Sequence, residues 1–222
     1  MTPQLPRLRS HQRDLAPIIL GAVLALCFAG CSGGYAEKAR RYELDYDISI
    51  DGDAATVRLD VRQPAGELKR ITLVGDLARS IHSSTGLLSK TTKGVEWQVP
   101  ATGGQLTWET RIDHLRQSGS RDAGVNERWG LFRAEDLIPP IASVTALGAD
   151  ASTRLRLQVP KDWSVVTPYR RGTDGWHAVE DSDRRFDKPD GWILIGDIGV
   201  RRDVIAGTET AIAAPRGAGA RR

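Results

Sequence analysis

The feature that most constrains the fold of this 222-residue chain is a strict two-residue alternation of apolar and polar side chains over residues 42–62. The apolar positions of the two runs are Tyr42, Leu44, Tyr46, Ile48 and Ile50, then Val57, Leu59 and Val61. Successive side chains of a β-strand point to opposite faces, so each run gathers its apolar groups on one side. Between the runs, Asp51-Gly52-Asp53 supplies residues that tolerate a positive φ. The pattern predicts an antiparallel hairpin with one buried face.

Short strand candidates recur along the rest of the chain, many of them separated by turn residues such as Gly, Pro and Asp. They span residues 71–74, 95–99, 106–112, 153–159, 163–167, 192–198 and 208–213. Only residues 134–137 and 141–147 are candidates for helical turns, and Pro139-Pro140 separates them. Many short strands without a helical period predict an all-β fold, an antiparallel β-sandwich.

Two further segments carry expectations about burial. Residues 116–128 are polar and contain glycine, which predicts an exposed loop, and the run from Trp129 to Phe132 should return to the core. Trp97 and Trp108 have strand spacing and apolar neighbours, so we expect both in the core.

The first thirty residues have the order of a secretory leader. Basic residues are followed by an eleven-residue apolar run at 18–28, too short for a membrane-spanning helix, which needs about 20 residues. Phe28-Ala29-Gly30-Cys31 resembles the bacterial lipobox, although Phe28 replaces the usual leucine, so cleavage is expected between Gly30 and Cys31 and lipidation on Cys31. Cys27 fits less well because the bulky Leu26 precedes it. The alternative is a plain signal peptide cut nearby, with Cys31 an ordinary thiol.

These features divide the chain into four parts. We expect a lipoprotein signal peptide at residues 1–30, a tether at 31–41, the β-sandwich domain at 42–215 and a disordered tail at 216–222. Ser32, where an aspartate would favour retention at the inner membrane, points to the periplasmic face of the outer membrane in a bacterial cell envelope. Loss of the leader removes three arginines and one aspartate and lowers the net charge from +3 to about +1. Nucleic acid is therefore not an expected partner.

The sequence contains none of the catalytic motifs that carry hydrolysis or phosphoryl transfer, such as Gly-x-Ser-x-Gly, a Walker glycine loop or His-Glu-x-x-His. Asp113-His114 would be adjacent on a strand and point to opposite faces. The acidic residues between Glu180 and Asp190 are interspersed with basic ones and match no calcium loop. We therefore expect no catalytic residues, no metal site and no cofactor.

Three tryptophans near predicted turns are candidates for a binding surface. Trp163, Trp176 and Trp192 could pack at the ends of the sandwich, which is the commoner role, or form a rim on which a ligand stacks.

The carboxyl-terminal segment, Phe186 to Pro215, contains Phe-Asp-x-Pro-x-Gly-Trp, Gly-x-x-Gly-Val-Arg-Arg and a closing Ala-Ala-Pro. It resembles the end of the amino-terminal β-domain in bacterial PDZ-containing metallopeptidases of the glycyl aminopeptidase family. The similarity extends to residues 42–50, 129–140 and 159–163. In that family a zinc-dependent catalytic domain follows, and its His-Glu-x-x-His helix has no counterpart among these residues. The resemblance therefore implies an accessory domain and carries over no catalytic residue.

Three functions remain open. The leading hypothesis is a lipid-anchored, non-catalytic periplasmic interaction domain, held on the membrane through Cys31. The second is a truncated or split component of a metallopeptidase, which would help a separately encoded peptidase to orient a peptide substrate. The third is a glycan or small-ligand binding lipoprotein that uses the tryptophan rim.

Overall fold

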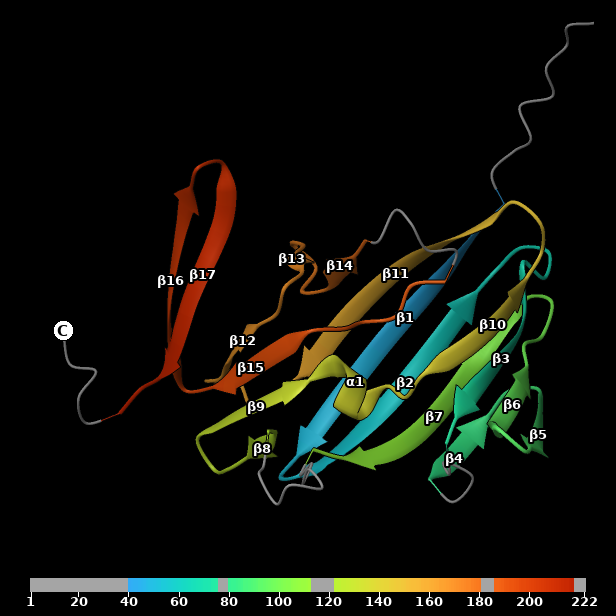
Figure 1. The fold of residues 1–222 in the computed structure, drawn as a ribbon, viewed down its shortest axis with the longest axis horizontal. Coiled ribbons are helices and arrows are strands. Elements are labelled where there is room, and N and C mark those ends of the chain that lie inside the picture. The colour runs from blue at the N-terminus through green and yellow to red at the C-terminus, as the bar shows by residue number, and fades with distance from the viewer. Residues whose placement is uncertain (1–39, 76–79, 113–121, 181–185, 218–222) are drawn as a thin grey trace, which may run out of the picture. The chain divides into compact units, whose positions relative to one another are not determined.

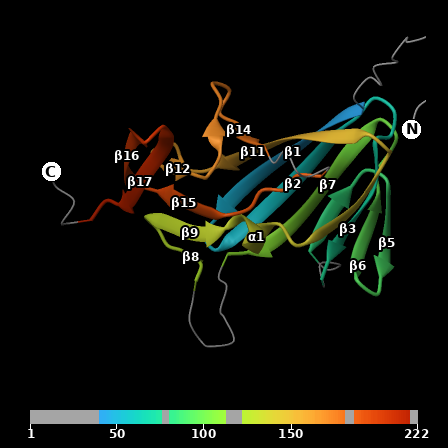
Figure 2. The same ribbon diagram turned by 45° about the horizontal axis from the view of Figure 1, so that its top comes forward.

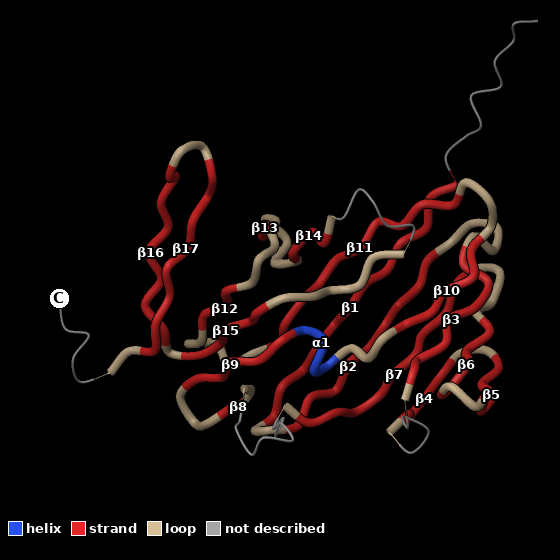
Figure 3. The backbone as a smooth tube through the Cα atoms, in the orientation of Figure 1, coloured by secondary structure: helices blue, strands red, loops and turns tan. Residues whose placement is uncertain are grey.

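The computed structural model describes residues 40–75, 80–112, 122–180 and 186–217, and in these residues the strands form four sheets (Figure 1). The largest sheet has the order β13 (Arg170–Arg171), β14 (His177–Val179), β11 (Ala149–Gln158), β1 (Arg40–Asp51), β2 (Ala54–Arg62), β7 (Gly103–Arg111), β4 (Ile81–Ser84). The expected all-β class is confirmed, since strands make up most of the described residues (Figure 3).

Three smaller sheets complete the fold. The second sheet has the order β10 (Ile141–Thr145), β3 (Leu68–Val74), β6 (Gly94–Gln98), β5 (Leu87–Thr91). The third has the order β12 (Ser164–Val166), β15 (Trp192–Gly196), β9 (Trp129–Arg133), β8 (Gly124–Val125). The last is a hairpin of β16 (Ile198–Ile205) and β17 (Thr208–Pro215), which extends away from the other sheets (Figures 1 and 2).

The predicted hairpin of residues 42–62 is confirmed. β1 and β2 pair antiparallel from Glu43↔Arg62 to Asp51↔Ala54, and Gly52 adopts a φ of 58° in the turn. The left-handed conformation favours glycine because it carries no Cβ. The apolar positions Tyr42 to Ile48 are fully buried, so one face of β1 lies entirely in the core.

The core lies between the inner face of the largest sheet and the residues of the second and third sheets. Trp97 on β6, Trp108 on β7 and Phe132 on β9 are fully buried, as the sequence predicts. The indole nitrogen of Trp108 donates to the carbonyl of Leu137 in the short helix α1 (Ala134–Leu137) at 3.0 Å. This bond ties α1 to the sheet, and it satisfies a polar group that would be costly to bury alone.

One of the two expected helical turns is confirmed and the other is wrong. Residues 134–137 form α1, where the carboxylate of Asp136 accepts a hydrogen bond from the Arg133 backbone at 2.8 Å. Residues 141–147 were expected to be helical, but 141–145 form strand β10, which pairs antiparallel with β3. The open edge of β3 supplies backbone partners, and the β-branched residues Ile141, Val144 and Thr145 suit a strand.

The largest sheet is also not purely antiparallel. β1 pairs in parallel with β11, in register from Arg40↔Ala149 to Ser49↔Gln158. A parallel pair requires a long crossover, and the whole second sheet and part of the third are built within this one. Several short strands, β4, β5, β8, β13 and β14, carry no pattern long enough to predict.

Candidate functional site

The solvent-facing side of the largest sheet carries a regular arrangement of opposite charges, which we call the charged lattice. It consists of Glu43, Asp45 and Asp47 on β1, Arg58, Asp60 and Arg62 on β2, and Arg154 and Arg156 on β11. The alternation that buries the apolar residues of these strands also brings the charged residues to one face. The register pairs Asp45 with Arg154 and Asp47 with Arg156 across the parallel ladder.

Each central carboxylate is held from both sides. Arg154 makes a bidentate pair with Asp45 at 2.9 and 2.7 Å, and Arg62 reaches the same carboxylate from β2 at 2.8 Å. Arg156 and Arg58 hold Asp47 in the same way. Bidentate guanidinium–carboxylate pairs are among the stronger protein hydrogen bonds.

The protonation of both carboxylates follows from this geometry. The side chains of Asp45 and Asp47 are only 5% and 1% exposed. Burial alone raises the pKa of Asp45, but hydrogen bonds from Arg154 and Arg62 outweigh it and hold the pKa below its ordinary value. The pKa of Asp47 is lowered for the same reason, by Arg156 and Gln158. Both groups are therefore ionised and fully occupied, which suits them to structure rather than to proton transfer.

Trp176 lies over this lattice. Its ring stacks on Arg154 at 4.8 Å and on Arg156 at 4.5 Å from the ring centroid. These cation–π contacts fix the turn between β13 and β14 against β11.

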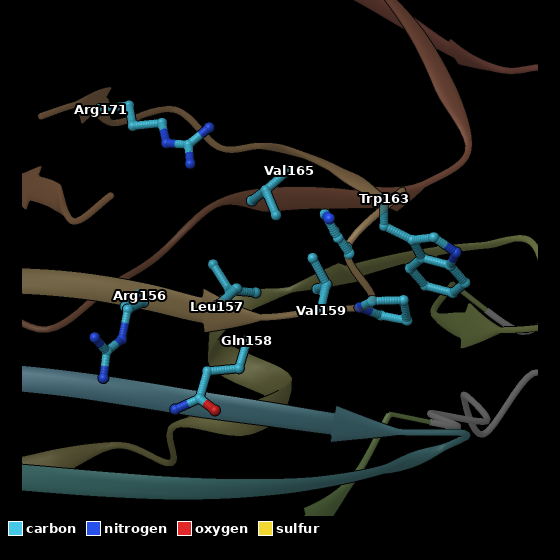
Figure 4. Close-up of a pocket in the computed structure, with 9 residues that line it drawn as sticks. Arg156, Leu157, Gln158, Val159, Trp163, Val165 and Arg171 are labelled. Carbon is cyan, nitrogen blue, oxygen red and sulfur yellow. The ribbon is translucent and has the colours of Figure 1, made fainter. Parts of the chain in front are cut away.

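Beside the lattice lie two pockets that share Val165 and Arg171, and we call them together the basic cleft. The first, of about 530 Å³, lies along the end of β11 and the turn to β12; its lining includes Leu157, Val159, Lys161 and Trp163. In Figure 4, Leu157, Val159 and Val165 lie between the guanidinium of Arg171 and the ring of Trp163.

The second pocket, of about 810 Å³, has the β16–β17 hairpin as one wall. Its lining includes Val165 and Val166 of β12, Arg170 and Arg171 of β13, and Arg202, Val204 and Ala211 of the hairpin. Tyr169 lines it between β12 and β13. Its hydroxyl accepts a hydrogen bond from the Asp190 backbone at 2.6 Å and lies 3.0 Å from the Asp190 carboxylate. The Tyr169 side of the pocket is therefore held in place by hydrogen bonds to Asp190.

Positive charge predominates in the lining of the basic cleft. Five cationic side chains line it, Arg156, Lys161, Arg170, Arg171 and Arg202, against one acidic side chain, Asp203. Lys161, Arg171 and Arg202 form no side-chain hydrogen bond or ion pair with any residue that the structure describes. His177 adds no charge at neutral pH, because burial lowers its pKa from an already sub-neutral value. The cleft therefore has a positive potential and the capacity to bind an anionic group.

The predicted site residues fall in different places. Gly30 and Cys31 lie outside the described residues, as does Asp113-His114. Trp163 lines the basic cleft, whereas Trp176 covers the charged lattice. Trp192 at the start of β15 is 45% exposed and has Arg133 over its ring at 4.7 Å. A stacking rim therefore stays a prediction for these three residues.

The charged lattice and the basic cleft are not among the sites predicted from the sequence. The lattice had a signal in the sequence, since the polar positions of β1 are acidic at Glu43, Asp45 and Asp47, and those of β2 include two arginines. The cleft had none, because its cations come from β11, β13, the turn before β12 and the hairpin, and only the fold brings them together.

Two observations bear on metals and membranes. No group of three or more His, Cys, Asp or Glu side chains in the described parts of the chain could hold a metal ion. In the same residues, no helix has the length and apolar character needed to cross a bilayer. Of the predicted polar loop at 116–128, the structure describes residues 122–128. In this part, Gly124–Val125 forms strand β8.

Comparisons with known proteins place the fold. No protein-family model matches the sequence, and no curated protein matches it. Among solved structures, an aminopeptidase N family protein from Idiomarina loihiensis matches with a TM-score of 0.53 and 19% identity, over 78% of this chain and 32% of that one. At this identity the match shows the fold alone: an all-β domain like the corresponding part of that protein.

Two further solved structures share less. An M1 zinc metallopeptidase from Deinococcus radiodurans has a TM-score of 0.45 and 17% identity, over 83% of this chain and 49% of that one. An aminopeptidase A from Legionella pneumophila has a TM-score of 0.37 and 15% identity, over 79% of this chain and 23% of that one. The chain thus spans less than half the length of each of the three. The similarity to an aminopeptidase domain drawn from the sequence is supported in coarser form by the first of these structures, which is an aminopeptidase N family protein rather than a glycyl aminopeptidase.

Proposed function

We propose that this chain is a lipid-anchored accessory domain of the bacterial cell envelope, which binds a partner and does not itself catalyse a reaction. The observation that carries the proposal is the fold match to an aminopeptidase N family protein, of which the matched region makes up 32%. By the resemblance drawn from the sequence, the matched part is an amino-terminal β-domain that precedes the catalytic one.

The chemistry of the described residues supports the non-catalytic part. A zinc hydrolase requires three protein ligands and a polarised water. The sequence has no His-Glu-x-x-His, and the carboxylates of Asp45 and Asp47 are occupied by arginines. Purified protein with added zinc should therefore not cleave peptide substrates. Robust cleavage that a chelator abolishes would overturn this part of the proposal.

The anchor is proposed on Cys31, and the location on the periplasmic face of the outer membrane. Cys31→Ser should leave the leader uncleaved or release the protein from the membrane fraction, because no acyl chains can then be attached. Cys27→Ser is the matched control and should be processed and sediment like the parent. If Cys31→Ser is also processed and sedimented like the parent, Cys31 does not carry the anchor.

A second function, a component that works with a separately encoded peptidase, is favoured by one observation. Among the residues that the structure describes, strand β12 lies at the end of its sheet and pairs only with β15, so its outer edge can accept another strand. A strand edge binds a peptide backbone without sequence demands, as orientation of a substrate would require. The test is whether the protein raises the rate at which an envelope peptidase cleaves an extended peptide. If the protein changes the cleavage rate of no envelope peptidase from the same cell, this second function is wrong and only the binding role remains.

A further inference from the structure

We infer that the basic cleft binds an acidic peptide segment in extended conformation, added as a strand along the free edge of β12. The inference rests on the proposed role as a binding domain and gives that role a class of ligand. Three properties of the cleft carry it: an open backbone edge, unpaired cations and exposed apolar side chains on the facing hairpin.

The backbone edge is available because two sheets end at the cleft. β12 is the last strand of the third sheet and β13 is the last strand of the largest sheet, and residues of both line the second pocket. An edge strand presents unpaired N–H and C=O groups that a further strand can bind. A peptide along β12 would thus gain main-chain hydrogen bonds.

The cations select for acidic side chains. Arg171 belongs to both pockets, Lys161 lies in the first and Arg202 faces the second from the hairpin. None of the three has a side-chain partner among the described residues, in contrast to the arginines of the charged lattice. Carboxylates on the bound segment would supply these partners, and the low acidic content of the lining leaves little competition.

The apolar side chains favour a segment that alternates in character. Val204 lines the second pocket and remains 64% exposed, and Val165 and Val166 face the same space. Side chains of an extended peptide alternate between two sides, so a sequence of acidic and apolar residues in turn presents carboxylates on one side and apolar groups on the other, and the lining offers both cations and valines. β12 is three residues long, so a peptide of about six residues covers its whole edge and extends past both ends.

The test is direct binding to the full chain purified in detergent, measured by fluorescence anisotropy. The probe is a labelled hexapeptide that alternates valine and glutamate, and the comparison peptide has lysine in place of glutamate. We expect the acidic peptide to bind, to weaken steeply with added salt, and to exceed the basic peptide at least tenfold in affinity. Equal binding of the two peptides, or no binding of the acidic one, would overturn the inference.

Arginine variants locate the site. Arg171→Glu and Arg202→Glu should each weaken binding about tenfold, because a repulsive charge replaces an attractive one. Arg201→Glu is the matched control, since Arg201 is adjacent in sequence, carries the same charge and does not line the cleft. All three residues are exposed, so thermal unfolding of the variants should match that of the parent. If Arg201→Glu weakens binding as much as Arg202→Glu, the effect is one of net charge and the cleft is not the site.

Backbone methylation of the peptide tests strand addition. N-methyl groups on one alternate set of amides should abolish binding, and on the other set should leave it unchanged, because only one set faces β12. If methylation of either set of amides has the same effect on affinity, the peptide does not bind as an added strand. Binding would then be electrostatic alone, and the proposed strand addition along β12 would be overturned.

Two other outcomes, cleavage of the probe and self-association of the chain, can be distinguished from simple peptide binding. Mass spectrometry of the bound probe reports cleavage, which would refute the proposed non-catalytic role without affecting the binding site. Sedimentation reports self-association: a dimer that excludes the peptide, and that Arg202→Glu dissociates, would make a second copy of the chain the occupant and overturn the peptide assignment.

Discussion

At the scale of single residues, the carboxylate of Asp47 lies at the centre of the charged lattice. It accepts hydrogen bonds from Arg58, Arg156 and Gln158, and its side chain is almost fully buried. Asp47→Ala should lower the free energy of unfolding by about 2 kcal/mol, because three partly exposed donors then lose a charged acceptor. Urea unfolding measures the change. Asp203→Ala, in an exposed pair with Arg201 at 3.7 Å, is the control and should change stability by less than about 0.5 kcal/mol.

The lattice should also make stability depend on pH. The folded pKa values of Asp45 and Asp47 are depressed, so their contribution is fully present above the unfolded pKa of about 3.9 and is lost as pH falls through the folded values. Unfolding midpoints in urea should therefore decline steeply below about pH 4. The double variant Asp45→Asn, Asp47→Asn should show a shallower decline; an unchanged slope would assign the acid sensitivity to other groups.

Tyr46 presents the opposite case, a buried polar group without a partner. Its ring is fully buried, and its hydroxyl has no hydrogen-bond partner in the described residues. Burial also raises the pKa of this hydroxyl far above its ordinary value. Tyr46→Phe should raise the free energy of unfolding by about 1 kcal/mol, because an unpaired buried hydroxyl is removed without loss of packing. A loss of stability on calorimetry would instead reveal a partner for this hydroxyl.

At the scale of elements, the connection between β15 and the hairpin depends on one glycine. Gly196 has a φ of 136°, and a Cβ there would clash with the backbone of Arg128 and Trp129. Gly196→Ala should therefore destabilise the fold by about 2–3 kcal/mol. Gly199→Ala, where no atom lies within 4 Å of the added carbon, should change stability by less than about 0.5 kcal/mol. Thermal unfolding separates the two variants, and equal melting temperatures would contradict the steric argument.

The elements also show what local sequence can and cannot predict. β1, β2, β7 and β11 are long, alternate strictly and were predicted from their pattern, since burial of one face controls side-chain spacing. The strand β10 was predicted as helical, because its residues are too few to fix a period and the open edge of β3 decides its conformation. The two- and three-residue strands β8, β13 and β14 exist only through their partners.

At the scale of the whole molecule, the same limit applies to the site. The basic cleft combines residues from Arg156 to Ala211, and its charge arises from the way that three sheets end side by side. No spacing in the sequence encodes such a convergence. The charged lattice, in contrast, could have been predicted from the sequence, because a hairpin with one apolar face must carry its charged side chains on the other face.

The parallel ladder between β1 and β11 has a consequence for how the chain reaches its folded state. Asp45 and its partner Arg154 are separated by 109 residues. The first hairpin joins strands that are adjacent in sequence and can form early, but β1 keeps an uncovered edge until β11 pairs with it. High contact order of this kind slows folding, and it exposes an aggregation-prone strand in the meantime. Chaperones that cover this edge would protect the chain until β11 docks.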